Sequence, residues 1–238
     1  KLSEDLGLKC VCKRINLKNR SFKNSSVEEA AREARYEFFR ASARRLNANV
    51  IATGHTIDDQ AETILMRLIK GASLKGIVGI SPVREGAGVR IIRPLIELEK
   101  DEIWNYLDEA GIAYRIDRTN LEPIYFRNIV RREIMPFLEK YNPRLKRALF
   151  NLAEHLREDF EFISSEKTKA ARQILREDKG TVEISLKDIV LQPRALQKEI
   201  LRDSLERAGG IVKKLSFRHW KELENLIKYK RRGNSVDL

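Results

Sequence analysis

The sequence contains few of the residues that build disulfide frameworks or metal clusters. Only two cysteines and three histidines occur among 238 residues, which excludes a disulfide-rich secreted scaffold and a cysteine-rich zinc module. Cys10 and Cys12 are one residue apart, too close for the usual zinc-ribbon or thioredoxin spacing. On a strand their side chains would lie on the same side. We therefore expect two reduced thiols in a cytoplasmic protein.

Long apolar segments are also missing. No run approaches the roughly 20 apolar residues of a transmembrane helix. The first residues do not show the secretory pattern of basic residues followed by an apolar stretch. With 42% hydrophobic and 34% charged residues, the chain is typical of one large or two small globular domains. We expect no membrane partner.

Acidic residues are outnumbered by basic ones. The chain has 47 lysines and arginines against 35 aspartates and glutamates, a net charge of +12. A local basic excess lies near the C-terminal end, within 213–232, and such an excess favours a nucleic acid as partner. A solvated helical face is the alternative for any single lysine. The predicted RNA-binding residues are Lys213, Lys214, Arg218, Lys230, Arg231 and Arg232.

Apolar periodicity predicts alternating strands and helices in the first part of the chain. The predicted elements are a strand through Cys10 to Ile15, a helix at about 27–46, a strand at 49–53, a helix at 57–70, a strand at 89–93 and a helix at 99–110. This alternation indicates an α/β fold with a parallel sheet covered by helices.

Helical patterns dominate from about residue 137. The predicted elements there are helices at 145–166, 168–176, 195–207 and 217–228, with one strand at Thr181–Ile184. We therefore predict a first domain at 1–136 and a smaller, mainly helical, basic domain at 137–238.

The most informative stretch, Gly54 to Thr63, lies where the strand at 49–53 gives way to a helix. It contains His55, Asp59 and Glu62, and the ends of strands in open α/β sheets are where ligands bind. Asp59 and Glu62 are three residues apart and share one helix face, whereas Asp58 points about 100° away. The simpler interpretation is that these acids only complement the helix dipole.

Two pairs of arginines have spacings that suit phosphate binding. Arg32 and Arg35 lie on the predicted helix at 27–46, where ordinary surface charge is the alternative. Arg127 and Arg131 are four apart, so both can face one anion. Asn128 adds a directional hydrogen bond, and two aromatic residues precede this group, as in base-stacking sites.

The pattern Gly54-His55-x-x-Asp58-Asp59-x-x-Glu62-Thr63 resembles the motif of the PP-loop ATP pyrophosphatase superfamily. Four further stretches narrow the resemblance to the tRNA(Ile)-lysidine synthase family. They are Glu28-Glu29-Ala30-Ala31-Arg32-Glu33-Ala34-Arg35-Tyr36, Ile92-Arg93-Pro94-Leu95, Asp117-x-x-Asn120 and Tyr125-Phe126-Arg127-Asn128-Ile129-Val130-Arg131.

Two departures from that family affect the expected activity. The family's phosphate loop, Ser-Gly-Gly-x-Asp-Ser, and a following segment with histidines and an arginine do not occur in these 238 residues. The last residues, 233–238, resemble the opening of the family's C-terminal region. We therefore expect a fragment that lacks its main ATP phosphate site.

The resemblance implies an adenine nucleotide α-hydrolase-like fold, incomplete at the N-terminus, with a partial catalytic domain at 1–136 and a tRNA-recognition domain at 137–238. It implies a ligase that uses ATP and Mg²⁺ to modify the wobble cytidine of tRNA(Ile) with a CAU anticodon. ATP adenylates the C2 oxygen and releases pyrophosphate. The amine of free L-lysine then displaces AMP, giving lysidine. The resemblance leaves open whether the protein is a homodimer.

The resemblance also assigns roles to the candidate residues. His55, Asp59 and Glu62 are expected to be catalytic, with Asp59 or Glu62 holding lysine or Mg²⁺ and His55 orienting or polarising. Asp59 is the predicted metal ligand. The predicted substrate- or phosphate-binding residues are Arg32, Arg35, Arg127, Asn128 and Arg131.

Three other functions compete with this one. A tRNA thiolase of the same superfamily would use sulfur in place of lysine, but its cysteines would have to come from the pair at Cys10 and Cys12. A metal hydrolase would take His55 and Asp59 as two ligands and needs at least a third. A non-catalytic RNA-binding module leaves the acidic motif unexplained.

Overall fold

The structure is a computed structural model. It describes residues 2–15, 27–86, 88–115, 126–178, 181–210, 212, 215 and 217–229. The chain divides into two compact units, Lys1–Leu152 and Ala153–Leu238, and the division falls within one helix, α8 (Leu145–Ile174). The predicted functional division at 136/137 stays a prediction.

Unit 1 contains a three-stranded mixed sheet in the order β1-β3-β2. β1 (Val50–Ala52) pairs in parallel with β3 (Val89–Ile92), with Ile51 opposite Ile91. The two apolar strands predicted here are confirmed. β2 (Val83–Gly86) joins the far side of β3 in antiparallel orientation. It was not predicted, because four residues with two charges and a glycine carry no strand signal.

The predicted strand through Cys10 is wrong. After α1 (Leu2–Asp5) and a left-handed turn at Gly7 (φ 63°), residues 8–15 run without regular hydrogen-bonded structure. Among the described residues no strand pairs with this segment, and β-propensity alone does not make a strand. The two thiols do lie on one side, with their Sγ atoms 3.6 Å apart.

Three helices of unit 1 follow the predicted periodicity. α2 (Val27–Arg45) packs beside β1. α3 (Ile57–Ile69) buries Ile57, Ala61 and Ile64 completely, which is the i, i+4, i+7 spacing of one helix face. The third is α5 (Lys100–Glu109). The short helix α4 (Leu74–Ile77) was not predicted.

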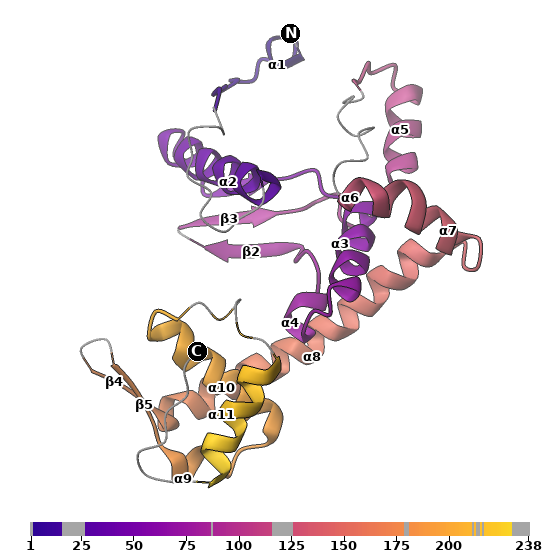
Figure 1. Ribbon diagram of the computed structural model, residues 1–238. Coiled ribbons are helices and arrows are strands. Elements are labelled where there is room, and N and C mark those ends of the chain that lie inside the picture. Colours follow the sequence, from indigo (N-terminus) through magenta and orange to yellow (C-terminus); the bar gives the residue numbers. More distant parts are fainter. Residues whose placement is uncertain are drawn as a thin grey trace. The chain divides into compact units, whose positions relative to one another are not determined.

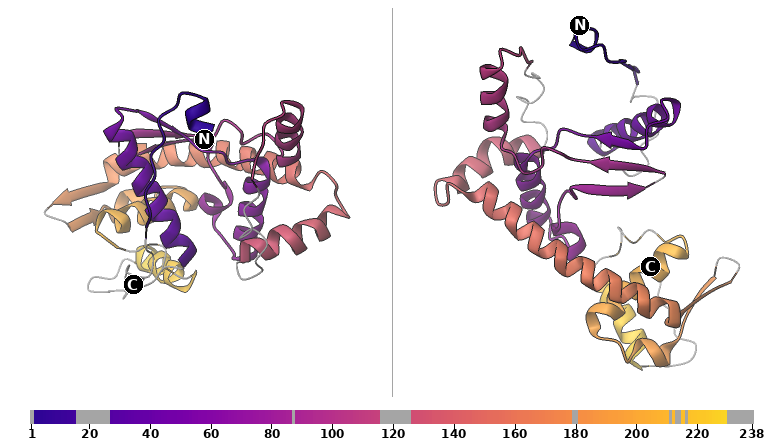
Figure 2. Two further views of the ribbon diagram at one scale, coloured as in Figure 1. Left: turned by 90° about the horizontal axis from the view of Figure 1, so that it is seen from above. Right: turned by 180° about the vertical axis from the view of Figure 1, so that it is seen from behind.

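A helical run then leads to α8. It consists of α6 (Phe126–Ile129), a π-helical turn η3 (Val130–Ile134) and α7 (Met135–Glu139). Residues 129 and 135, which flank the π turn, have α-helical backbone angles, so the three pieces form one continuous helix. Figure 1 shows α6 beside α3 at the end of the sheet to which β3 points, and both views of Figure 2 agree.

Unit 2 is mainly helical, as predicted. Its elements after α8 are the hairpin of β4 (Leu175–Asp178) and β5 (Thr181–Ile184), then α9 (Leu186–Ile189), α10 (Arg194–Arg207) and α11 (Phe217–Tyr229). The two helices predicted at 145–166 and 168–176 are one helix, α8. The hydrophobic core of unit 2 contains Ile174, Ile189, Ile200, Leu201, Trp220, Leu223 and Ile227.

In the described part of the chain, no helix combines the length and the apolar character needed to cross a membrane.

Candidate active site

Four residues separate the end of β1 from the start of α3, and Asp59 caps the N-terminus of this helix. One carboxylate oxygen, Oδ2, accepts hydrogen bonds from the backbone N–H of Thr56 (3.0 Å) and from its hydroxyl (3.2 Å). This is the helix-capping arrangement in which an acidic side chain reaches back to the residue before the helix. Half of the Asp59 carboxylate therefore has a structural role, as the simpler interpretation of the sequence anticipated.

The other half of Asp59 joins Glu62 in binding two arginines. Arg127 donates from Nη2 to Asp59 Oδ1 (3.0 Å) and from Nε to Glu62 Oε2 (2.8 Å). Arg131 donates from Nε to Glu62 Oε1 (2.6 Å) and from Nη2 to Oε2 (3.0 Å). The two predicted catalytic acids and two of the four predicted phosphate-binding arginines thus form one cluster, which we call the carboxylate–arginine cluster.

Burial ranks the members of this cluster. The Glu62 side chain is 4% exposed and Asp59 is 17% exposed, whereas Arg127 and Arg131 are 30% and 27% exposed. A buried carboxylate needs compensation, and both oxygens of Glu62 receive it. The hydrogen bonds that Arg131 donates to Glu62 in turn raise the pKa of Arg131. Glu62 is therefore positioned to hold both guanidinium groups in place.

His55 lies within electrostatic range of Asp59 and Arg127 in this cluster, and its lowered pKa favours the neutral imidazole. Its Nδ1 is 2.9 Å from the hydroxyl of Thr53. Burial lowers the pKa of His55, and neighbouring positive charge lowers it further, against the opposing attraction of Asp59. The positive charges belong to Arg93, Arg127 and Arg32. A neutral imidazole at physiological pH can accept a proton.

Arg93 was not predicted as a site residue. It follows β3 directly, is 4% exposed, and donates to the Ser81 carbonyl (2.5 Å) and to the Tyr36 hydroxyl (3.5 Å). Its Nε is buried without a hydrogen-bond partner among the described residues. Arg32 lies over the Tyr36 ring at 5.7 Å. The sequence signal that could have identified Arg93 is its position as a charged residue directly after the apolar strand β3.

Asp58 contributes to a separate set of contacts. Its oxygens accept from Lys146 Nζ (2.9 Å) and from the backbone N–H of Lys100 (2.9 Å). Burial by itself raises the pKa of Asp58, but these two donors outweigh it, so that the pKa lies below its usual value. Asp58 thereby ties the start of α3 to the starts of α5 and α8.

Comparison with known proteins now decides the family. The profile of the PP-loop domain matches residues 1–138, more than half of the chain. The chain belongs to the PP-loop family. A PP-loop domain is an ATP-binding domain, and the predicted α/β fold class and family resemblance are confirmed.

Three relatives of this chain are tRNA(Ile)-lysidine synthases. The chain is 35% identical to the tRNA(Ile)-lysidine synthase of Clostridioides difficile, over 95% of this chain and 49% of that protein. It is 36% identical to that of Geobacter sulfurreducens, over 85% of this chain and 43% of that protein, and 36% identical to that of Bacillus subtilis, over 74% of this chain and 38% of that protein. The chain spans about half the length of the curated relatives it matches first.

A solved structure supports the same fold. The U34-tRNA thiolase NcsA from Methanococcus maripaludis, solved with its [4Fe-4S] cluster, superposes with a TM-score of 0.52 at 21% identity. The match covers 66% of this chain and 53% of that one. At this identity the likeness shows the PP-loop fold alone.

The described residues of the PP-loop domain do not form a complete protein cage for a metal ion. Among them, no group of three His, Cys, Asp or Glu side chains could hold a metal ion. Both oxygens of Asp59 already accept hydrogen bonds, from Thr56 and Arg127. The assignment of Mg²⁺ to Asp59 stays a prediction, and we derive no step through it.

The structure describes three further predicted residues, and the others lie outside the described part of the chain. Arg35 is exposed on α2, and Asn128 is buried on α6. Arg218 is exposed on α11 and pairs with Glu222 at 2.8 Å. The remaining ones lie outside the described residues: Lys213, Lys214, Lys230, Arg231 and Arg232, together with Asp117, Asn120, Tyr125 and the side chain of Glu28.

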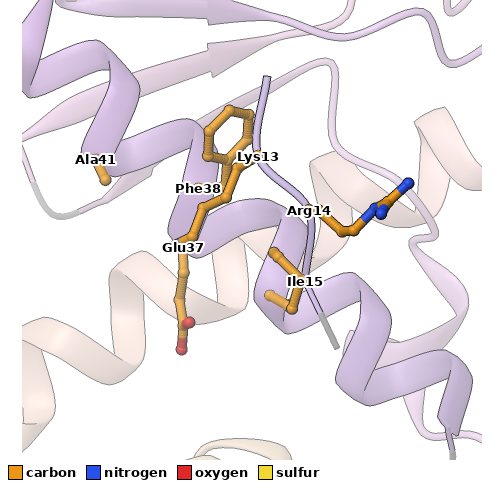
Figure 3. Close-up of a pocket in the computed structure, with 7 residues that line it drawn as sticks. Lys13, Arg14, Ile15, Glu37, Phe38 and Ala41 are labelled. Atoms are coloured by element: carbon orange, nitrogen blue, oxygen red, sulfur yellow. The ribbon is translucent and has the colours of Figure 1, made fainter. Parts of the chain in front are cut away.

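The PP-loop domain also has a pocket of about 450 Å³ that contains none of the predicted site residues. Figure 3 shows it between the segment Lys13–Ile15 and the face of α2 that carries Phe38 and Ala41. The carboxylate–arginine cluster is therefore a separate feature, built on helix ends and not in this hollow.

Proposed function

We propose that the chain acts as part of a tRNA(Ile)-lysidine synthase, which converts the wobble cytidine of tRNA(Ile) with a CAU anticodon to lysidine. One observation carries the proposal: identity of 33–36% to lysidine synthases over 85–100% of this chain. The reaction forms a bond between the cytosine C2 oxygen and the α-phosphorus of ATP and releases pyrophosphate. The amine of lysine then bonds to C2, and AMP leaves.

The donors around His55 suit the phosphates of ATP. Arg93 has a buried Nε with no partner among the described residues, and Arg32 adds a second positive charge close enough to lower the pKa of His55. Fixed cations of this kind stabilise the charge that builds up as pyrophosphate leaves. Arg32 and Arg93 are therefore the residues of this chain that we propose to hold phosphate oxygens.

We assign the remaining roles to members of the carboxylate–arginine cluster according to how exposed each side chain is. Glu62 is nearly fully buried and holds Arg127 and Arg131, so we assign it a positioning role. Arg127 uses two of its five N–H groups on these carboxylates, and its others can face a phosphate. Asp59 is the more accessible acid, suited to the ammonium group of lysine. His55, whose pKa is lowered by burial, is suited to accept the proton that the ammonium group loses.

The basic C-terminal region supports contacts with tRNA. We propose that residues 137–238 recognise tRNA, through the six basic residues predicted from the sequence. A tRNA-modifying enzyme of this kind works in the cytoplasm.

Lysine-dependent modification tests the proposal directly. The natural full-length protein is incubated with ATP, lysine and a tRNA(Ile) transcript with a CAU anticodon, and the nucleosides are analysed by mass spectrometry. We expect lysidine, formed only when lysine is present. Glu62→Gln should lower kcat about 100-fold, the scale of losing one preorganised electrostatic contact. Glu85→Gln is the matched control, because Glu85 pairs with Arg90 on the surface.

A tRNA thiolase is the second candidate. The fold neighbour is a U34-tRNA thiolase, and the thiols of Cys10 and Cys12 are exposed and 3.6 Å apart. The same assay with sulfide in place of lysine separates the two. A thiolated nucleoside and no lysidine would replace the proposed function with this one.

A further inference from the structure

Two exposed aromatic rings lie together at the end of α7 in unit 1. The exposed fractions of Phe137 and Tyr141 are 53% and 77%. Their ring centroids are 5.5 Å apart in an edge-to-face arrangement. Single exposed hydrophobic residues are common, but a contacting pair of rings left in solvent marks a binding surface.

Positive charge surrounds these rings. Lys140 lies between them in the sequence and Arg144 follows, and both are exposed. Two acids, Glu133 and Glu139, lie in the same stretch of chain, and Glu139 is 3.6 Å from Lys146, which also pairs with Asp58. Exposed rings interleaved with cations are the composition of surfaces that bind single-stranded nucleic acid, where bases stack on the rings and phosphates meet the cations.

Helix α5 provides the contrast. It also carries exposed aromatic residues, Trp104 (41%) and Tyr106 (66%). Four exposed acids accompany them on that helix: Asp101, Glu102, Asp108 and Glu109. Such a surface repels phosphate. Aromatic exposure alone therefore does not distinguish α7 from α5; the sign of the neighbouring charge does.

The rings belong to the same continuous helix as the candidate active site. Phe137 follows Arg127 by ten residues, about 15 Å along a helix axis, and Figure 1 shows α7 continuing from α6. An RNA loop that places one base at the carboxylate–arginine cluster therefore has further nucleotides within reach of α7. We propose that Phe137, Lys140, Tyr141 and Arg144 form a stacking surface for unpaired nucleotides of that loop, an inference that rests on the proposed function.

Binding of two RNAs to the 238-residue chain tests the surface. One is a stem closed by a CAU-containing anticodon loop, and the other is the same stem extended into a continuous duplex; both are followed by fluorescence anisotropy. We expect the double variant Phe137→Ala, Tyr141→Ala to bind the loop RNA at least ten-fold more weakly, the scale of losing base stacking. Its affinity for the duplex should not change.

Three further variants separate stacking from other effects. Tyr141→Phe keeps the ring and should bind the loop as the unsubstituted chain does. Tyr106→Ala removes an equally exposed ring from acidic α5 and should change nothing. The double variant Lys140→Gln, Arg144→Gln should weaken both RNAs and flatten the dependence of affinity on salt, because fewer counterions are released.

The inference is overturned if the ring variants bind the loop RNA normally, or if Tyr106→Ala weakens it equally. A ring variant that alters only the oligomeric state in sedimentation would make the surface an interface between copies. If the natural full-length protein makes no lysidine but the ring variants bind the loop RNA more weakly, the proposed function is wrong and the proposed stacking surface is supported. If lysidine forms and the ring variants leave the KM for tRNA unchanged, the proposed stacking surface is wrong and the proposed function is not.

Discussion

Three acids within one turn of α3 have three different environments. Asp58 binds Lys146 and the N-terminus of α5, Asp59 divides its oxygens between the helix cap and Arg127, and Glu62 gives both oxygens to arginines. Because neighbouring residues on a helix point about 100° apart, each acid reaches different partners. The chemistry of this motif is therefore set by those partners as much as by its own residues.

Asp58 makes a pH-dependent contribution to stability. Its folded-state pKa is lowered, so its stabilisation is present above the unfolded pKa of about 3.9 and is lost as the pH falls through the folded value. We expect Asp58→Asn to lower the free energy of unfolding by about 1–2 kcal/mol at neutral pH, and the difference to close in acid. Urea unfolding at several pH values measures this.

A surface variant controls for the loss of a carboxylate as such. Asp101 is exposed in the first turn of α5, and Asp101→Asn should shift stability by no more than about 0.5 kcal/mol. A deficit of Asp58→Asn that persisted unchanged below the folded pKa would contradict the ion-pair account.

The sequence located these acids but not their partners. Asp59 and Glu62 share a helix face, and Arg127 and Arg131 are spaced to bind one anion; both follow from local geometry. The meeting of the two groups joins residues 65 to 69 positions apart in the chain, which no local pattern contains. The sequence predicts that the arginines face phosphate and that the acids face lysine or Mg²⁺, whereas the structure brings Arg127 and Arg131 into contact with Asp59 and Glu62.

At the scale of elements, the loop after α4 fits closely onto α3. Gln60 is fully buried, and its Oε1 accepts a hydrogen bond from the backbone N–H of Ile80 at 2.5 Å. Gly79 has a φ of +78°, and a Cβ placed there would lie 2.5 Å from the same oxygen. Only glycine meets both requirements, the backbone angle and the close approach.

Replacing this glycine should therefore cost more than backbone strain alone. We expect Gly79→Ala to destabilise the protein by about 2–4 kcal/mol, the sum of a left-handed alanine and local overpacking. Gly111→Ala is the matched control, since Gly111 has a φ of +64° but open space around its Cα, and should cost about 1 kcal/mol. Equal losses in denaturant unfolding would show that crowding at Gln60 has no effect.

Elements with strong apolar periodicity were predictable, and short polar ones were not. α2, α3, α5, α10 and α11 lie within a residue or two of their predicted ranges. β2 and β4 are four residues each, with the sequences VREG and LRED, and they are strands because a neighbour pairs with them. The segment at 8–15 has the opposite property: strand-forming residues without a described partner.

At the scale of the whole molecule, each unit has its own hydrophobic core. Trp220 belongs to the core of unit 2, and Ile57, Ile96 and Phe150 form a cluster in unit 1. Separate cores lead us to expect separate unfolding transitions. The two tryptophans of the chain fall one in each unit, which allows one unit to be followed alone.

In a Trp104→Phe background, fluorescence reports on Trp220. We expect Ile200→Ala to lower the stability seen at Trp220 by about 3 kcal/mol, the cost of an emptied core position. Ile64→Ala, also at 0% exposure but in unit 1, should leave that transition in place. A common shift in both variants would mean that the two units unfold together.

The π turn at Val130–Ile134 has a consequence for how the chain could vary. Such a turn holds one residue more than an α-helical turn would, and it sits between Arg127 and the rings of Phe137 and Tyr141. Deleting one residue there would rotate everything downstream by about 100° about the helix axis. The number of residues in this single turn therefore fixes the rotation about the helix axis between Arg127 and the two rings.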